Sequence, residues 1–105
     1  QVFQKNGDFV EEGLIAPWTL ANGSVWDIEI SPEAGQAFLY VADGANKRIW
    51  IVERESLELV GEIGSGGRNA GFFDWVHNVA IDSEGNIYTS EVNEGKRVQK
   101  FLRTE

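Results

Sequence analysis

Residues 66–101 read GGRNAGFFDWVHNVAIDSEGNIYTSEVNEGKRVQKF and contain three short runs with the character of β-strands. The runs are residues 76–81, 87–90 and 97–102. The connectors between them carry Gly85 with Asn86 and Gly95 with Asn93, residues that permit the positive φ angles of tight hairpins. The stretch therefore predicts a three-stranded antiparallel meander that requires a fourth strand.

An earlier part of the chain repeats this pattern. Residues 25–31 align with residues 76–82, and the apolar positions of the two segments coincide. The alignment places Trp26 on His77 and continues with Tyr40 on Tyr88. The sequence therefore contains two copies of one unit of short strands.

The first residues belong to a third, partial copy. Phe3, Val52 and Phe101 are evenly spaced, 49 residues apart. A turn and a further strand are predicted after each of the first two, over residues 8–16 and 57–63. The chain is thus expected to hold the tail of one unit, one whole unit and three-quarters of another.

A repeat of about 40–50 residues with four strands is typical of a β-propeller blade. We therefore predict an all-β chain with about two four-stranded blades. They form a single segment, residues 1–105: residues 1–24 are the outer strand of a shared blade and a linker, residues 25–64 a full blade, and residues 65–105 three strands of the next. A small sandwich or barrel is the alternative interpretation of such strands.

Two blades cannot cover their own faces, because each blade of a propeller packs against a neighbour on both sides. The strand predicted over residues 8–16 is a spare outer strand, and the second blade lacks one. Passing this strand to another molecule would cover an exposed edge and create a head-to-tail contact. We therefore expect strand exchange in a homo-oligomer, with three chains forming a six-bladed homotrimeric ring. The alternative is a fragment of a longer propeller.

The composition argues against several classes of function. A net charge of −8, from 9 basic and 17 acidic residues, disfavours partners such as nucleic acid or an anionic membrane surface. No apolar run approaches the ~20 residues of a membrane-spanning helix. The chain has no cysteine, hence no thiolate chemistry, and its single histidine leaves no nucleophile–base pair for acyl transfer. The sequence does not indicate a compartment.

The second copy resembles an NHL repeat. The matching residues are the aromatic pair Phe72-Phe73, the strand Val76-His77-Asn78-Val79-Ala80-Ile81-Asp82, the strand Gly85-Asn86-Ile87-Tyr88 and the strand Arg97-Val98-Gln99-Lys100-Phe101. The first copy matches more loosely. This resemblance implies a six-bladed propeller, the same ring size that three two-bladed chains would give.

Within the NHL family, the chain resembles the peptidyl-α-hydroxyglycine α-amidating lyases in its candidate functional residues. The resemblance implies a zinc ion in the central channel, held by histidines at the start of the innermost strand of alternate blades. His77 stands at that position, with Val76 where the family usually has proline, and Trp26 occupies the equivalent position of the other blade. A three-fold ring would then bring three His77 side chains to one ion.

The chemistry of such a site follows from its ligands. Three neutral imidazoles with one open position are typical of catalytic zinc, which polarises a bound water or substrate oxygen. The alternative for His77 is a channel-lining residue with one hydrogen bond. Asp27 and Asn78 follow the two inner positions. They would either point polar groups into the channel, to orient a metal ligand or bind substrate, or bond to the backbone of a neighbouring blade.

Two further residues are candidates for contact with a substrate. Arg68 lies on the loop that leads to the inner strand, where it would meet an anionic group. Trp26 would form an apolar wall for a ligand or pack the channel.

The sequence leaves two functions open. The first is a metal-dependent enzyme of lyase-like type, with His77 of each protomer as a zinc ligand and a small molecule or peptide as substrate. The second is a non-catalytic scaffold that binds a protein or carbohydrate through its rim loops, as many NHL propellers do.

Overall fold

The computed structural model describes residues 1–19 and 25–104, so residues 20–24 of the predicted linker and residue 105 lie outside the described part. Within it the chain forms nine strands and no helix. No described segment is a helix of the length and hydropathy needed to cross a membrane. The strands are β1 (Val2–Phe3), β2 (Phe9–Glu11), β3 (Val25–Ile30), β4 (Phe38–Asp43), β5 (Arg48–Glu53), β6 (Leu59–Ile63), β7 (Val76–Ile81), β8 (Ile87–Glu91) and β9 (Val98–Phe101).

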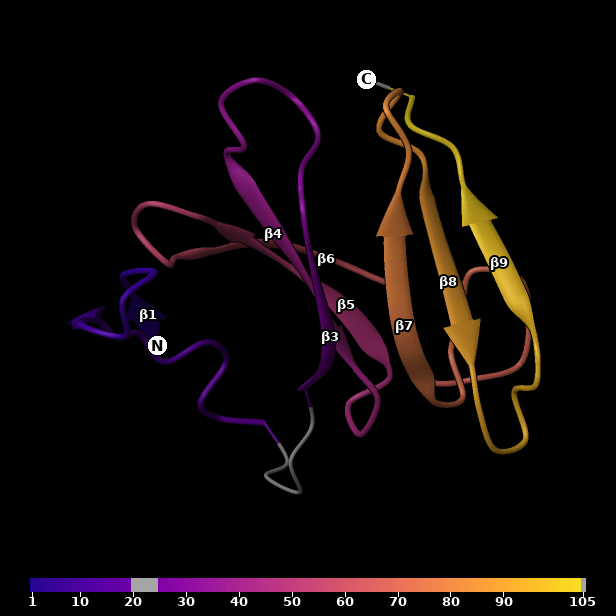
Figure 1. Ribbon diagram of the computed structural model, residues 1–105. Helices are drawn as coiled ribbons and strands as arrows, with labels where there is room; N and C mark the ends of the chain where they lie inside the picture. The colour runs from indigo at the N-terminus through magenta and orange to yellow at the C-terminus, as the bar shows by residue number, and fades with distance from the viewer. Residues whose placement is uncertain (20–24, 105) are drawn as a thin grey trace.

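The described strands form three antiparallel sheets (Figure 1). β1 and β2 form a hairpin, β3-β4-β5-β6 a four-stranded sheet and β7-β8-β9 a three-stranded sheet. The predicted all-β class is confirmed, and so is the meander, because β7, β8 and β9 pair antiparallel in chain order. The hairpin connectors behave as their composition predicts, with positive φ at Gly85 and Asn93.

The outer strand predicted over residues 8–16 is wrong in its length. β2 covers Phe9–Glu11 only. Beyond it Gly13 and Pro17 interrupt the run, and Ala16 adopts a positive φ of 49°. Thr19 closes a turn there, donating both its backbone N–H and its hydroxyl to the carbonyl oxygen of Ala16. These turn-forming residues prevail over the apolar character of residues 14–16.

The two larger sheets share an irregularity in their first strands. In β3 the ladder with β4 shifts at Trp26, and in β7 the ladder with β8 shifts at His77. A β-bulge of this kind bends its strand and redirects the side chain of the extra residue. The two residues that the sequence repeat aligns are therefore also equivalent in the backbone.

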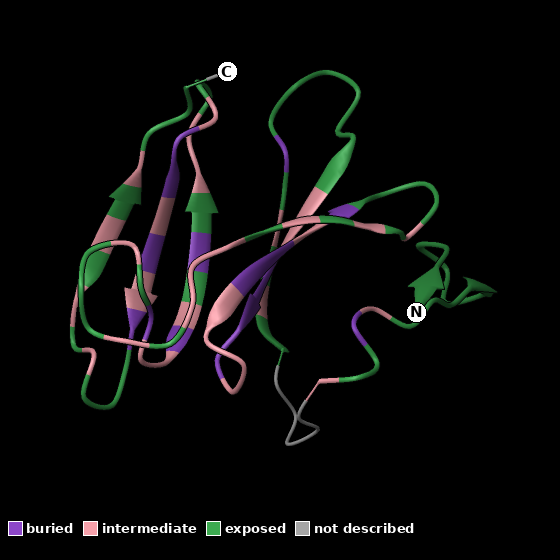
Figure 2. Ribbon diagram, turned by 180° about the vertical axis from the view of Figure 1, so that it is seen from behind, coloured by how far each residue is buried: buried purple, intermediate pink, exposed green. Residues whose placement is uncertain are grey.

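The main core lies between the four-stranded and the three-stranded sheet, where β3 runs next to β7 (Figures 1 and 2). Phe73 is fully buried there with Val76 and Ile49. A Cβ atom at Gly64 would lie 2.4 Å from the Phe73 ring, and Gly64 has a φ of 85°, so this position requires glycine. Ala42, Val79 and Ile87 complete the buried set.

A second apolar cluster covers part of the opposite face of the four-stranded sheet. Ala16 packs there with Val41 and Trp50. Toward β3 the same face is open, with Ile28 53% exposed and Ile30 41% exposed. The sheet thus carries apolar side chains on both faces, as expected for a layer with a neighbour on each side.

We predict that Phe73→Ala lowers the free energy of unfolding by about 3–5 kcal/mol, because it leaves a cavity between the two sheets. Phe72→Ala is the matched control. Phe72 is 37% exposed, and its truncation should cost ~1 kcal/mol or less. Urea unfolding followed by tryptophan fluorescence measures both, and equal losses would contradict the placement of Phe73 between the sheets.

Candidate functional site

The two bulges bring Trp26 and His77 together at one end of β3 and β7, and we call this cluster the Trp26–His77 site. The ring centroids lie 5.0 Å apart with planes inclined by 32°, so the indole covers one side of the imidazole. Trp75 meets Trp26 edge-on, with centroids 6.0 Å apart. A Cβ atom at Gly44 would lie 2.5 Å from Trp75 Nε1, so glycine makes room for these rings. His77 is half-buried, and its imidazole retains access to solvent.

Asp27 joins the two sheets beside this site. Its Oδ2 accepts a hydrogen bond from the backbone N–H of Val79, 3.0 Å away, and its Oδ1 accepts one from the N–H of Ile28 at 2.9 Å. Because Val79 belongs to β7, the carboxylate connects the first strands of both sheets. The structure thus places Asp27 in the backbone-bonding role, one of the two roles expected for it.

Asn78 determines which nitrogen of His77 carries a hydrogen. Asn78 Nδ2 donates to Asp27 Oδ2 at 3.4 Å, and Asn78 Oδ1 lies 2.7 Å from His77 Nδ1. A carboxylate only accepts hydrogen bonds, so the amide turns its NH2 group toward Asp27 and its oxygen toward the imidazole. Because an amide oxygen only accepts hydrogen bonds, Nδ1 must carry the hydrogen of this contact. In the neutral ring Nε2 then has the free lone pair, the form that binds a metal or accepts a proton.

Ser90 supports this arrangement from the neighbouring strand. Its hydroxyl donates to Asn78 Oδ1 at 3.4 Å, a second bond to the oxygen that faces the imidazole. Sequence reasoning missed Ser90. The sequence repeat could have indicated this residue. Ser90 aligns with Ala42 of the first copy, so a hydroxymethyl group replaces a methyl group at a position next to the inner strand.

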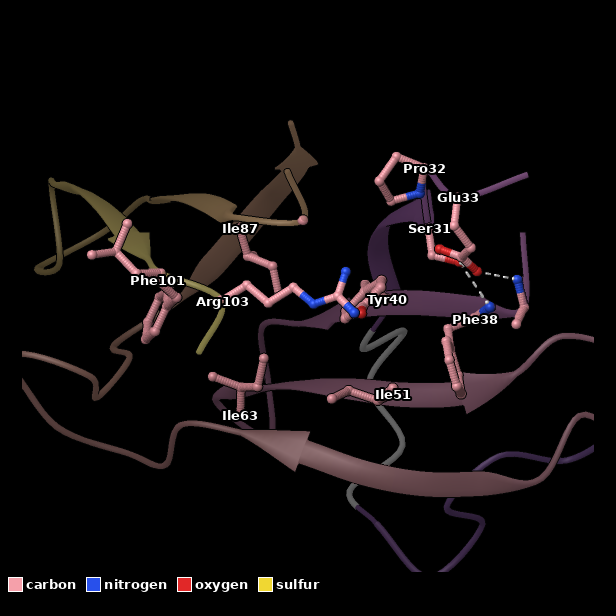
Figure 3. Close-up of a pocket in the computed structure, with 13 residues that line it drawn as sticks. Ser31, Pro32, Glu33, Phe38, Tyr40, Ile51, Ile63, Ile87, Phe101 and Arg103 are labelled. Carbon is pink, nitrogen blue, oxygen red and sulfur yellow. Dashed lines mark hydrogen bonds between the residues drawn. The ribbon is translucent and has the colours of Figure 1, made fainter. Parts of the chain in front are cut away.

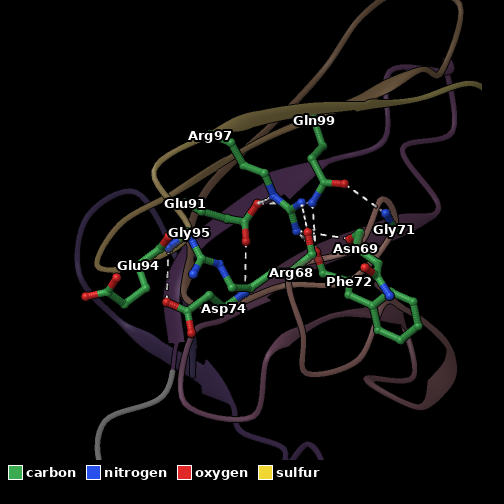
Figure 4. A network of polar contacts seen from close by, with 10 residues as sticks. All are labelled: Arg68, Asn69, Gly71, Phe72, Asp74, Glu91, Glu94, Gly95, Arg97 and Gln99. Atoms are coloured by element: carbon green, nitrogen blue, oxygen red, sulfur yellow. Dashed lines mark hydrogen bonds and ion pairs between the residues drawn. The ribbon is translucent and has the colours of Figure 1, made fainter.

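Arg68 belongs to a polar network that fastens the loop before β7 to the three-stranded sheet (Figure 4). Its guanidinium donates to the carbonyl oxygen of Glu94 at 3.1 Å, and its own carbonyl oxygen accepts from Arg97. The side chain is exposed and is held at the turn between β8 and β9. The contacts described for Arg68 are therefore with this network and not with the Trp26–His77 site.

Glu91 is the acceptor around which this network is built. Its side chain is fully buried and accepts from Arg97 Nε at 2.6 Å and from Gln99 Nε2 at 3.0 Å. Its second oxygen accepts from the backbone N–H of Asp74 at 2.8 Å. A buried carboxylate is tolerated only when it is paired in this way. The equivalent acid of the other sheet, Asp43, is also buried and accepts from the Trp50 indole at 2.8 Å.

A pocket of about 480 Å³ opens between the two sheets at the end opposite the Trp26–His77 site (Figure 3). Its wall is largely apolar and includes Ile51, Ile63 and Phe101. Arg103 reaches into it beside Tyr40. Its lining includes a carboxylate and a guanidinium but no imidazole. The pocket therefore suits the binding of an apolar group with an anionic end.

The carboxylate of this pocket is already engaged. The backbone N–H of Ala37 is the main cause that holds the pKa of Glu33 below its usual value, followed by the hydroxyl of Ser31. The bonds of Glu33 thus stabilise the loop at pH values above the usual carboxyl pKa, and this contribution is lost as the pH falls through the lowered pKa. Burial raises the pKa of Tyr40.

The pattern of strands in the sequence does not predict this pocket. Arg103 stands 49 residues after Arg54, the same spacing that relates Phe101 to Val52. In the first sheet Arg54 donates to the carbonyl oxygen of Gln36 at 2.6 Å. This repetition marks the position of Arg103, but the apolar wall depends on how the two sheets pack.

The described residues of a single chain do not gather into a metal-binding cluster. Residues 1–19 and 25–104 contain no group of three or more His, Cys, Asp or Glu side chains placed to hold an ion. The chain offers one imidazole with a free Nε2, because His77 is its sole histidine. A complete set of imidazole ligands would need His77 from further chains.

We predict that the neutral His77 ring carries its hydrogen on Nδ1, which two-bond ¹⁵N–¹H correlation spectra report directly. Asn78→Ala removes the acceptor, so the ring should then populate both tautomers. Ser90→Ala leaves the amide in place and should preserve the spectrum. A hydrogen on Nε2 in the unaltered protein would contradict the assigned hydrogen bonds.

Comparison with known proteins adds no family to this description. No family model and no curated protein sequence matches the chain. The proposed function therefore rests on the residues, on their geometry and on the resemblance to NHL repeats.

Proposed function

We propose that this chain supplies two blades of an NHL-type β-propeller, and that three chains close a six-bladed ring with a metal-dependent, lyase-like site on its axis. One observation carries the proposal. Two sheets with the same strand order, each bulged in its first strand, pack face to face with the bulged residues in contact. Repeated sheets arranged around a central axis are the architecture of a propeller.

The outward faces of the two sheets support a further contact of the same kind. Ile28, 53% exposed, aligns with Val79, which is 4% exposed in the core between the sheets. On the three-stranded sheet Val98 is 72% exposed, and its counterpart Ile49 is fully buried in that core. Exposed side chains thus have counterparts buried at the internal contact. A head-to-tail contact between chains would bury them in the same way.

The proposed ring would draw one His77 from every second blade. Three such imidazoles would leave one coordination position open for water or substrate, and zinc bound there would supply a Lewis acid that polarises a substrate oxygen. Residues of the same chain hold the His77 imidazole in a form that can bind zinc. Asn78 holds Nδ1 and leaves Nε2 free, while Trp26 covers one side of the imidazole and limits its rotation.

The pocket beside Arg103 favours a second candidate function, a non-catalytic scaffold. It lies between loops and strand ends, away from the Trp26–His77 site, and its apolar wall fits part of a protein or ligand. The two functions differ in their need for metal, which makes them separable by one measurement.

Metal content tests the proposed enzyme. We expect elemental analysis of the assembled, dialysed protein to give about one zinc ion for three chains. His77→Ala should abolish zinc binding and leave the assembly intact, because the imidazole is half-buried and outside the main apolar core. Trp26→Phe keeps His77 and Asn78 and should retain the zinc.

The outcomes separate the alternatives. An assembled protein free of zinc, with no change in His77→Ala, would rule out the metal-dependent site and leave the scaffold function. Zinc that persists at the same ratio in His77→Ala would place the ion elsewhere.

A further inference from the structure

The N-terminal hairpin repeats the outer hairpin of the four-stranded sheet. Where β6 pairs with β5, its ladder skips one residue between Leu59 and Gly61. Where β2 pairs with β1, its ladder skips one residue between Phe9 and Glu11. The two irregularities are at matching positions, because Leu59 lies opposite Val52 and Phe9 lies opposite Phe3, and the sequence repeat aligns Val52 with Phe3. β1 therefore corresponds to β5, and β2 to β6.

β9 also corresponds to β5, but it lacks the partner that β5 has. β5 pairs with β4 on one edge and with β6 on the other, whereas β9 pairs with β8 and has no second neighbour among the described strands. Phe101 stands opposite Ile87 just as Val52 stands opposite Leu39. The free edge of β9 exposes backbone N–H and C=O groups that favour pairing with another strand.

β2 has a partner strand but packs against no larger sheet among the described strands. All residues of β1 and β2 are exposed, and Phe3 and Phe9 are 52% and 57% exposed although their rings touch edge-on. Figure 2 shows the hairpin standing apart from both larger sheets. An isolated two-stranded hairpin is marginally stable in water. Its two-residue partner β1 can therefore be exchanged for a longer strand.

We infer that β2 of one copy pairs with the free edge of β9 of a second copy, in the register of β6 on β5. This inference rests on the proposed head-to-tail ring and names the segment that joins its members. The register places Phe9 opposite Phe101 of the second copy, and Glu11 opposite Lys100. Within one chain β2 and β9 do not pair in this structure, since they lie on opposite sides of the four-stranded sheet (Figures 1 and 2).

The charges of the two strands agree with this register. β2 and its flanks are acidic, with Asp8, Glu11 and Glu12, whereas β9 and its flanks carry Arg97, Lys100 and Arg103. The internal hairpin contains the corresponding pair, since Arg48 of β5 contacts Glu62 of β6 at 3.0 Å. Arg97 and Glu12 occupy the aligned positions. Opposite charges that face each other across two strands stabilise the pairing and help to fix its register.

Charge reversal tests the register in the full-length chain. Glu11→Lys places two cations opposite each other and should weaken association about fivefold, measured by sedimentation equilibrium, and Lys100→Glu should act similarly. The double variant restores opposite charges and should return to within about twofold of the original association. Loss in the double variant equal to the sum of the single losses would overturn the register.

Disulfide trapping tests the pairing by a second route, because the chain has no cysteine of its own. Phe9→Cys combined with Phe101→Cys should give covalently linked chains on mild oxidation. Phe9→Cys combined with Lys100→Cys is the matched control, since neighbouring residues of a strand point to opposite faces. Assembly of normal size with no linkage would overturn strand exchange and leave the ring standing. Monomers in every variant would overturn both.

Discussion

The contact between β3 and β7 is the constraint on which the rest of this structure depends. Burial of Phe73 and Val76 against the four-stranded sheet supplies the apolar contact. The carboxylate of Asp27, bonded to the backbone N–H of Val79, fixes how the two first strands lie relative to each other. Because that bond crosses between sheets, it also sets which side chains meet at the strand ends, and the stacking of Trp26 on His77 follows from it.

Much of the architecture could be predicted because the chain contains its pattern twice. The alignment of Trp26 with His77 located two first strands, and the Gly-Asn connectors located the hairpins. The strand over residues 8–16 was the failure. Apolar residues there suggested a long outer strand, but a turn at Ala16 ends the extended run. Local turn chemistry decided the length of β2, and a pattern of apolar residues carries little information about such a turn.

The sequence repeat placed Trp26 and His77 at equivalent positions, but it did not indicate which imidazole nitrogen carries the hydrogen. His77 and Asn78 are neighbours in the chain, yet the orientation of the Asn78 amide is set by Asp27, 51 residues earlier, through a contact between two sheets. Arg68 shows the same limit. Its place before the inner strand suggested a substrate contact, and its observed hydrogen bond is to the backbone of Glu94. The pocket beside Arg103 likewise depends on packing between sheets, which no single strand pattern encodes.

The exposed faces and edges of the chain share one property. Each exposed feature has a counterpart elsewhere in the chain that is covered. These features are Ile28, Val98, the free edge of β9 and the N-terminal hairpin. In the proposed ring, further copies of the same chain would cover them, and each copy would contribute one imidazole. Light scattering on the purified full-length protein tests the ring most directly. A particle with three times the mass of the chain is expected, and a stable monomer at micromolar concentration would rule the ring out.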